Sequence, residues 1–176
     1  MIANKPKQNI VIENTTLKYV NKTKILGLNF KSNNFFKSQV DENIKMAKLE
    51  LKKLYKFRYL KRSIKVRLYK SKVLPLLTYA AVPLNICSQT QRNRLQKIQN
   101  KAIRWISNSY YPNICNIENQ QEILKIEPIN DRINRLAQNV WFKIEEENST
   151  FFEETLNIPI IHGHAWFKSS YAQTFE

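Results

Sequence analysis

One stretch of this chain carries many positive charges and no negative charge, and no other feature constrains its folding as strongly. The 176 residues include 29 Lys and Arg against 14 Asp and Glu, a net charge of +15. Between Glu50 and Glu118 there is no acidic residue, whereas the interval 51–117 holds fifteen basic ones. Like charges gathered in this way raise the free energy of the compact state unless a polyanion neutralises them. The sequence therefore favours a polyanionic partner.

The basic stretch is expected to bind the phosphate backbone of a nucleic acid. Such binding depends on charge and counterion release, and it discriminates little between base sequences. Nucleic acid is favoured well ahead of an anionic membrane surface, and no membrane partner is expected. A helical bundle whose charge reflects composition alone is a further alternative. The predicted phosphate contacts are Lys52, Lys53, Lys56, Arg58, Lys61, Arg62, Lys65, Arg67 and Lys70, together with Arg94, Lys97, Lys101 and Arg104 on a later helix.

Residues that support phosphoryl or hydrolytic chemistry are sparse. The only two aspartates, Asp41 and Asp131, are ninety residues apart, so no adjacent pair exists for two metal ions. Two glycines are too few for a Gly-rich phosphate-binding loop. His162 and His164 have no further ligand nearby, and we expect them in an exposed tail rather than at a metal. We therefore predict no catalytic residue, no metal site and no cofactor in this chain.

The spacing of apolar residues predicts a mainly α fold, a helical bundle with a small β element at its start. Short β-rich runs alternate with turn-forming residues, and from Phe36 the apolar period becomes that of a helix. The expected strands are 10–12, 17–20 and 25–30, with turns at 14–15 and 21–22. The expected units are a β-hairpin unit, a basic helical domain and an irregular tail, with bounds 1–35, 36–147 and 148–176.

The first two helices of the basic domain are predicted from one apolar face each. The first starts near Phe36, ends between Tyr55 and Tyr59, and buries Val40, Ile44, Ala47, Leu51 and Leu54. In the second, Ser63 is the expected N-cap, Pro75 the expected kink and Pro83 the expected end. Its apolar face is Val66, Tyr69, Val73, Leu76, Leu77 and Ala80.

The later helices are predicted from their start signals and their apolar faces. Ser88 and Gln91 form a capping box before a helix that buries Leu95, Ile98, Ala102, Trp105 and Ile106. A short helix is expected at 118–125, with a break at Pro128. Asp131 is expected to open the last helix, whose apolar face is Ile133, Leu136, Ala137, Val140 and Ile144.

Several aromatic and sulfur-containing residues allow two interpretations. Trp105 and Trp141 are predicted to lie in the core. For Tyr55, Phe57 and Tyr59, core packing is favoured over stacking against nucleobases. The two cysteines, Cys87 and Cys115, are expected to be idle thiols in a reducing compartment rather than a disulfide. No apolar signal segment is visible near the start, which predicts a nuclear or cytoplasmic protein that is not secreted.

Four segments, in one order along the chain, carry a family resemblance. They are LKYVNKTKILGLNF at 17–30, LYKSKVLPLLTYA at 68–80, LQKIQNKAIRWI at 95–106 and LKIEPINDRINRLA at 124–137. The order resembles the region after the polymerase palm in reverse transcriptases of non-LTR retrotransposons, particularly jockey-like ones. There, a Leu-Gly pair belongs to the primer-grip hairpin, and the later segments read LYKSxVxPxLxYA, LxxIQxxAxRxI and PI/PLxxR. The resemblance covers about residues 10–147.

The resemblance implies the end of the palm at 1–35 and a helical thumb at 36–147 of an RNA-directed DNA polymerase that serves transposition. Leu26 and Gly27 would support the primer end, and the basic helices would hold an RNA–DNA heteroduplex or DNA. The family's catalytic aspartate pair is absent, so the chain is expected to be inactive alone, with Mg²⁺ needed only in an intact parent enzyme. The missing palm and fingers are a further expected partner. The alternatives are a stand-alone basic helical nucleic-acid-binding protein and a non-functional retroelement remnant.

Overall fold

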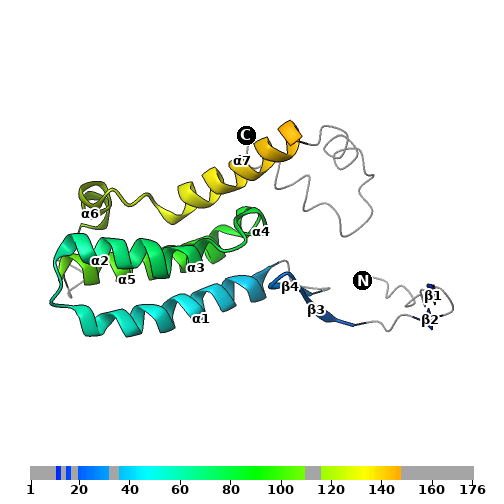
Figure 1. The fold of residues 1–176 in the computed structure, drawn as a ribbon, viewed down its shortest axis with the longest axis horizontal. Helices are drawn as coiled ribbons and strands as arrows, with labels where there is room; N and C mark the ends of the chain where they lie inside the picture. The colour runs from blue at the N-terminus through cyan, green and yellow to red at the C-terminus, as the bar shows by residue number, and fades with distance from the viewer. Residues whose placement is uncertain (1–10, 13–14, 17–19, 32–35, 110–115, 148–176) are drawn as a thin grey trace.

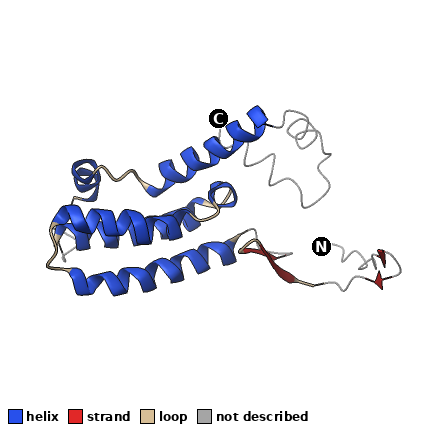
Figure 2. Cartoon of the chain, in the orientation of Figure 1, coloured by secondary structure: helices blue, strands red, loops and turns tan. Residues whose placement is uncertain are grey.

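Helices make up most of the structure, a computed structural model that describes residues 11–12, 15–16, 20–31, 36–109 and 116–147. Two short antiparallel hairpins precede the helices (Figures 1 and 2). This arrangement confirms the mainly α fold with a small β element at its start. The expected irregular tail at 148–176 lies outside the described residues.

Each hairpin pairs two consecutive strands: β1 (Val11–Ile12) with β2 (Thr15–Thr16), and β3 (Lys22–Ile25) with β4 (Leu28–Lys31). The expected strand at 25–30 is wrong, because the chain turns at Leu26 and Gly27. Their φ angles of 48° and 82° suit a two-residue hairpin turn of the mirror-image type, which glycine adopts without a Cβ clash. The turn expected at 21–22 is wrong too, because Lys22 begins β3. Residues 17–19 of a further expected strand lie outside the described residues.

Three helical runs form the bundle. They are α1 (Lys37–Leu54), the run of α2 (Arg62–Leu68), η2 (Tyr69–Val73) and α3 (Leu74–Thr78), and finally α5 (Gln89–Ser107). In Figure 1, α1 and α5 run in the same direction, and the α2–α3 run returns in the opposite one. The apolar faces expected for α1 and α5 are confirmed, since all ten of their residues are buried. The capping box is confirmed as well: the backbone N–H of Ser88 donates to Gln91 Oε1 at 3.1 Å.

The second helical run departs from the prediction at both ends. Its N-cap is Lys61, so Ser63 lies inside the first turn of α2. It ends at Thr78, because Tyr79 is extended and its carbonyl accepts a hydrogen bond from Asn43 Nδ2 on α1 at 3.0 Å. Pro83 falls instead in the first turn of α4 (Ala81–Asn85), where the N–H that proline lacks has no helical partner anyway.

Where the sequence predicts a kink at Pro75, the structure has a widened helical turn directly before the proline. Immediately before the proline, residues Tyr69–Val73 form a π-helix, and Pro75 itself lies in the first turn of α3. Inserted π turns are a recognised way for a helix to change its hydrogen-bonding register. Pro75 therefore lies in the first turn of a new helical segment, where the N–H that it lacks is not needed for a helical hydrogen bond.

The last two helices close over the bundle. They are α6 (Ile117–Leu124), which ends at the left-handed Lys125, and α7 (Ile129–Glu147). The last helix begins two residues before the expected Asp131, because Gln96 Oε1 on α5 accepts from the N–H of Ile129 at 2.9 Å. The prediction that Val140 belongs to the buried apolar face of this helix is wrong, because its side chain is 42% exposed. Toward its end α7 diverges from the other helices (Figure 1). Trp141 is buried, and its predicted place in the core is confirmed.

Gln99 joins the bundle to the last two helices. Its side chain is fully buried, and its Nε2 donates to Tyr69 Oη at 3.0 Å and to the carbonyl of Glu127 at 3.0 Å. Its Oε1 accepts from Gln121 Nε2 on α6 at 3.2 Å. Burial raises the pKa of Tyr69 to about 12, so the phenol stays protonated. This polar group therefore fixes α6 against α5 and the π-helical segment.

Candidate nucleic-acid interface

A groove along α1 and α5 carries cations from two different helices. Its cationic lining is Lys45, Lys48 and Lys52 from α1 and Arg94 from α5, over the apolar Ile44 and Leu49 and beside Asp41. The lysines recur every three or four residues and so share one face of α1. We call this feature, together with Lys97 and Lys101, the cationic groove. Two packed helices thus line one depression with cations, three lysines from α1 and one arginine from α5.

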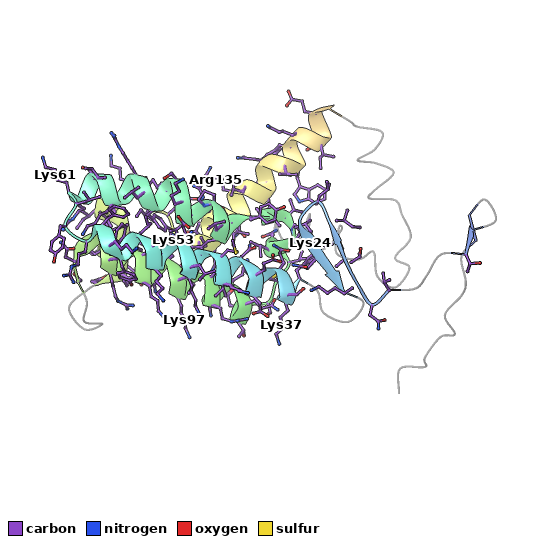
Figure 3. The ribbon with its side chains drawn as sticks, turned by 60° about the horizontal axis from the view of Figure 1, so that its bottom comes forward. Lys24, Lys37, Lys53, Lys61, Lys97 and Arg135 are labelled. Carbon is purple, nitrogen blue, oxygen red and sulfur yellow. The ribbon has the colours of Figure 1, made fainter. Side chains whose placement is uncertain are left out.

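Lys97 and Lys101 extend the groove along α5. They stand three and seven residues after Arg94, on the same face of the helix, and both are exposed. Figure 3 shows Lys97 at the edge of the bundle. Arg104 follows on this face but is partly buried. The stripe expected on α5 is therefore accessible chiefly through its two lysines.

The few carboxylates described before Glu118 are already paired. Arg94 Nη2 lies 2.7 Å from Asp41 Oδ1, Lys24 Nζ lies 3.1 Å from Glu42 Oε1, and Lys53 Nζ lies 2.9 Å from Glu50 Oε2. The side chain of Asn29 donates to Glu42, and this bond and Lys24 lower the pKa of Glu42. In the part of the chain that the structure describes, Lys45, Lys48 and Lys52 form no ion pair. Positive charge in the groove is thus left for an outside anion.

A second group of exposed cations lies where α1 is joined to α2. The joining segment contains η1 (Tyr55–Phe57), one turn of 3₁₀-helix. Figure 3 shows Lys61 at this end of the bundle. The exposed cations of this end are Lys53, Lys56, Arg58, Lys61 and Arg62. They continue the positive charge of the groove past the end of α1.

Lys65 is the clear error among the predicted phosphate contacts. Its side chain is fully buried, and its Nζ donates to Asn108 Oδ1 and, at 3.3 Å, to the carbonyl of Trp105. The ammonium also lies 5.5 Å from the centre of the Trp105 ring. Burial, with a smaller contribution from the charge of Arg62, lowers the pKa of Lys65. This lysine faces the end of α5 and not a ligand.

Arg67 and Lys70 lie apart from the groove. Both are exposed on the second helical run, and Lys70 Nζ donates to the carbonyl of Lys125, between α6 and α7, at 3.1 Å. Lys70 therefore faces the last two helices. The thirteen predicted cations do not form one continuous surface: they divide among the groove, the α1–α2 end and the second helical run, with Lys65 inside.

The three aromatic residues after α1 are not in the core. Tyr55, Phe57 and Tyr59 are 42%, 48% and 83% exposed, so the favoured prediction of core packing is wrong for all three. The guanidinium of Arg58 lies 4.7 Å from the centre of the Tyr59 ring. The apolar face of α1 ends at Leu54, and the narrower 3₁₀ turn rotates the following side chains off that face.

The tip of the second hairpin is held by contacts that the sequence did not suggest. Tyr79 Oη donates to the carbonyl of Leu26 at 2.7 Å, and Leu26 itself is 91% exposed. Behind the tip, the backbone N–H of Asn29 donates to Gln39 Oε1 at 3.1 Å, and Gln39 Nε2 donates to Asn43 Oδ1 at 2.8 Å. One signal was present: Gln39 and Asn43 are four apart and share the core-facing side of α1.

Other classes of site find little support in the residues that the structure describes. Within these residues, no three or more His, Cys, Asp and Glu side chains are grouped so as to hold a metal ion. No described helix has the length and apolar character to cross a membrane. Cys87 is a buried free thiol whose pKa burial raises to about 11. Cys115, His162 and His164 lie outside the described residues.

Comparison with protein-family models, with curated proteins and with solved structures finds no match to this chain.

Proposed function

We propose that this chain binds the backbone of a template-primer duplex, an RNA–DNA heteroduplex or DNA, as the thumb-like part of a retrotransposon RNA-directed DNA polymerase. It binds and does not catalyse. The single observation that carries the proposal is the cationic groove, a depression lined by three lysines of α1 and by Arg94 of the parallel α5. Among the described residues only Arg94 has a carboxylate partner, Asp41, and the three lysines have none. A duplex backbone presents phosphates in two rows, which suits cations held on two rigid elements.

The order of elements supports the retroelement assignment over a stand-alone binding protein. A hairpin whose turn is Leu26-Gly27 directly precedes the first basic helix, as the sequence resemblance implies for a primer grip followed by a thumb. At this turn the exposed Leu26 is the residue accessible to a primer strand, whereas Tyr79 Oη fills the space beside Gly27 where a Cβ would stand. The exposed Val20, Ile25 and Leu26 are apolar, and they favour a further polymerase domain against the hairpin.

The test is a salt titration of duplex binding with two matched variants. If about five cations contact phosphates, the logarithm of the binding constant falls against the logarithm of salt concentration with a slope near −4.5. Lys48→Gln with Lys97→Gln removes two groove charges, and the slope is expected to fall to about −2.7. The control, Lys125→Gln with Lys143→Gln, makes the same change in net charge at exposed sites on or beside α6 and α7.

The expected result is a weaker, less salt-dependent complex for the groove variant alone, with helicity by circular dichroism unchanged in both. Equal losses in the two variants would show that only net charge matters. Unchanged binding by the groove variant would show that the groove is not the interface.

A further inference from the structure

We propose that the segment 55–59, between α1 and α2, binds unpaired nucleobases of a single strand by stacking, where that strand leaves the duplex in the groove. The proposal rests on the proposed function, because it places a second subsite at the end of the same surface. Its ligand is different: planar bases rather than phosphates. Below, this segment is called the aromatic loop.

The first support is the exposure of flat aromatic surface. Phe57 and Tyr59 are 48% and 83% exposed. Leaving such rings in water forgoes the free energy that burial of apolar surface supplies. Stacking a nucleobase on these rings would bury that apolar surface and supply this free energy, because every base has a π-face that stacks on an aromatic ring.

The second support is that the loop is built to hold its rings in place. Tyr55–Phe57 form a 3₁₀ turn, and the N–H of Leu60 donates to the carbonyl of Phe57 at 3.2 Å, which closes the following turn. Arg58 Nη2 donates to Tyr59 Oη, and the guanidinium lies over one face of the ring. Since Tyr59 remains 83% exposed, its other face is accessible to a base. Little conformational freedom is then left to lose on binding.

The third support is position and charge. The loop follows directly from α1, and the axial rise from Lys48 to Tyr55 is roughly 10 Å. A backbone that follows the groove lysines therefore reaches the rings. The exposed Lys56 lies within the loop, and the exposed Lys61 and Arg62 follow it directly in the sequence. No carboxylate belongs to the interval 51–117. Aromatic rings between cations are the combination that single-strand binding sites use.

The test compares two DNA duplexes of one sequence: one blunt, and one with a single-stranded extension that carries 2-aminopurine. The variant Phe57→Ala with Tyr59→Ala is expected to lose the extra affinity given by the extension, about 5- to 150-fold for each stacked base. It is also expected to lose the quenching of 2-aminopurine that stacking causes. Affinity for the blunt duplex is expected to stay within twofold. An extension made of RNA serves as a second arm and identifies the strand that the loop prefers.

Two further variants keep the test decisive. Phe57→Trp with Tyr59→Trp retains stacking surface and is expected to restore both signals. Tyr59→Ala alone changes the most exposed ring, and serves if the double variant fails to fold.

Three outcomes would overturn the aromatic loop proposal. In the first, the Phe57→Ala, Tyr59→Ala variant keeps the full effect of the DNA and RNA extensions; in the second, it loses equal affinity for blunt and extended duplexes. In the third, it loses affinity only for vesicles of phosphatidylserine and phosphatidylcholine, offered in a parallel assay, and for neither duplex. Blunt-duplex binding reports on the proposed function separately. A chain that binds no blunt duplex contradicts that function, whereas one that binds it but ignores the extension contradicts only the loop.

Discussion

The ammonium of Lys65 lies at the carboxyl end of α5, where it donates to the carbonyl of Trp105 and to Asn108. The last carbonyls of a helix lack helical partners, and a cation there is favoured by the helix dipole. Burial acts in the other direction, since it removes the ammonium from water and lowers the pKa of Lys65. The lowered pKa, whose main cause is burial, means that the charged form of Lys65 is less favoured here than in water.

Replacing this residue separates its structural role from the binding that the sequence suggested. Lys65→Met is expected to be neutral or stabilising by about 1–2 kcal/mol, and Lys65→Glu to destabilise by about 3–5 kcal/mol, because its carboxylate is buried beside carbonyl oxygens. Urea unfolding measures both. Lys65→Met is expected to leave duplex affinity within twofold, whereas Lys52→Met, in the groove, reduces the salt slope by about 0.9. Loss of affinity in Lys65→Met with stability retained would contradict the buried role.

At the scale of elements, the second hairpin depends on α1 and the α3–α4 junction for its orientation. A two-stranded hairpin is only marginally stable by itself. Here Tyr79 binds the turn, and Gln39 binds the following strand through Asn29. The turn also lacks room: a Cβ built on Gly27 would stand 2.5 Å from Tyr79 Oη, and the φ of Gly27 is +82°.

Gly27→Ala is therefore expected to loosen the hairpin for two reasons. The left-handed backbone costs about 1–2 kcal/mol with an alanine, and the new methyl group displaces the Tyr79 hydroxyl. Hydrogen exchange at the N–H of Asn29 is the measurement, and faster exchange is expected. Tyr79→Phe alone removes only the hydrogen bond, at about 0.5–1.5 kcal/mol.

A double-mutant cycle that combines Gly27→Ala with Tyr79→Phe is the control. Gly27→Ala is expected to cost less in the Tyr79→Phe background, because the obstructing oxygen is gone. Additive effects would contradict the contact between Gly27 and Tyr79.

How far the sequence predicts an element depends on whether local pattern or distant contact decides it. The apolar faces of α1 and α5 and the capping box at Ser88 follow from local spacing, and each is confirmed. The end of α3 does not, because Asn43, 36 residues away, binds the carbonyl of Tyr79. The turn of the second hairpin is hard to predict, because Ile25, Leu28 and Phe30 have the β-rich apolar character of one continuous strand although Gly27 interrupts them.

The candidate site was predictable in composition but not in layout. A tract without carboxylates identifies the cations, and Lys48, Lys52, Lys97 and Lys101 are indeed exposed. The burial of Lys65 could not be predicted from the sequence, because its contacts lie about forty residues away, at the end of α5. Exposure of Tyr59 was hidden as well, since an aromatic residue beside a helical face looks like core.

At the scale of the whole molecule, the charge is unevenly distributed rather than merely large. The interval 51–117 carries fifteen basic residues and no acidic one, and Asp41, Glu42 and Glu50 are occupied by Arg94, Lys24 and Lys53. Cations gathered along the cationic groove repel each other, and a bound polyanion relieves this repulsion. Folding and ligand binding are therefore linked: a polyanion that prefers the folded groove stabilises the fold.

Heparin is expected to raise the midpoint of thermal unfolding. At a free concentration of about 100 times Kd, a ligand of the folded state adds roughly 2.7 kcal/mol. For a chain of this size that is a rise of about 5–10 °C. The groove variant with Lys48→Gln and Lys97→Gln is expected to show a smaller rise than its matched control with Lys125→Gln and Lys143→Gln, while uncharged dextran leaves the midpoint unchanged. A midpoint that falls with heparin would mean that the polyanion prefers the unfolded chain, in which case the folded arrangement of cations is not what binds it.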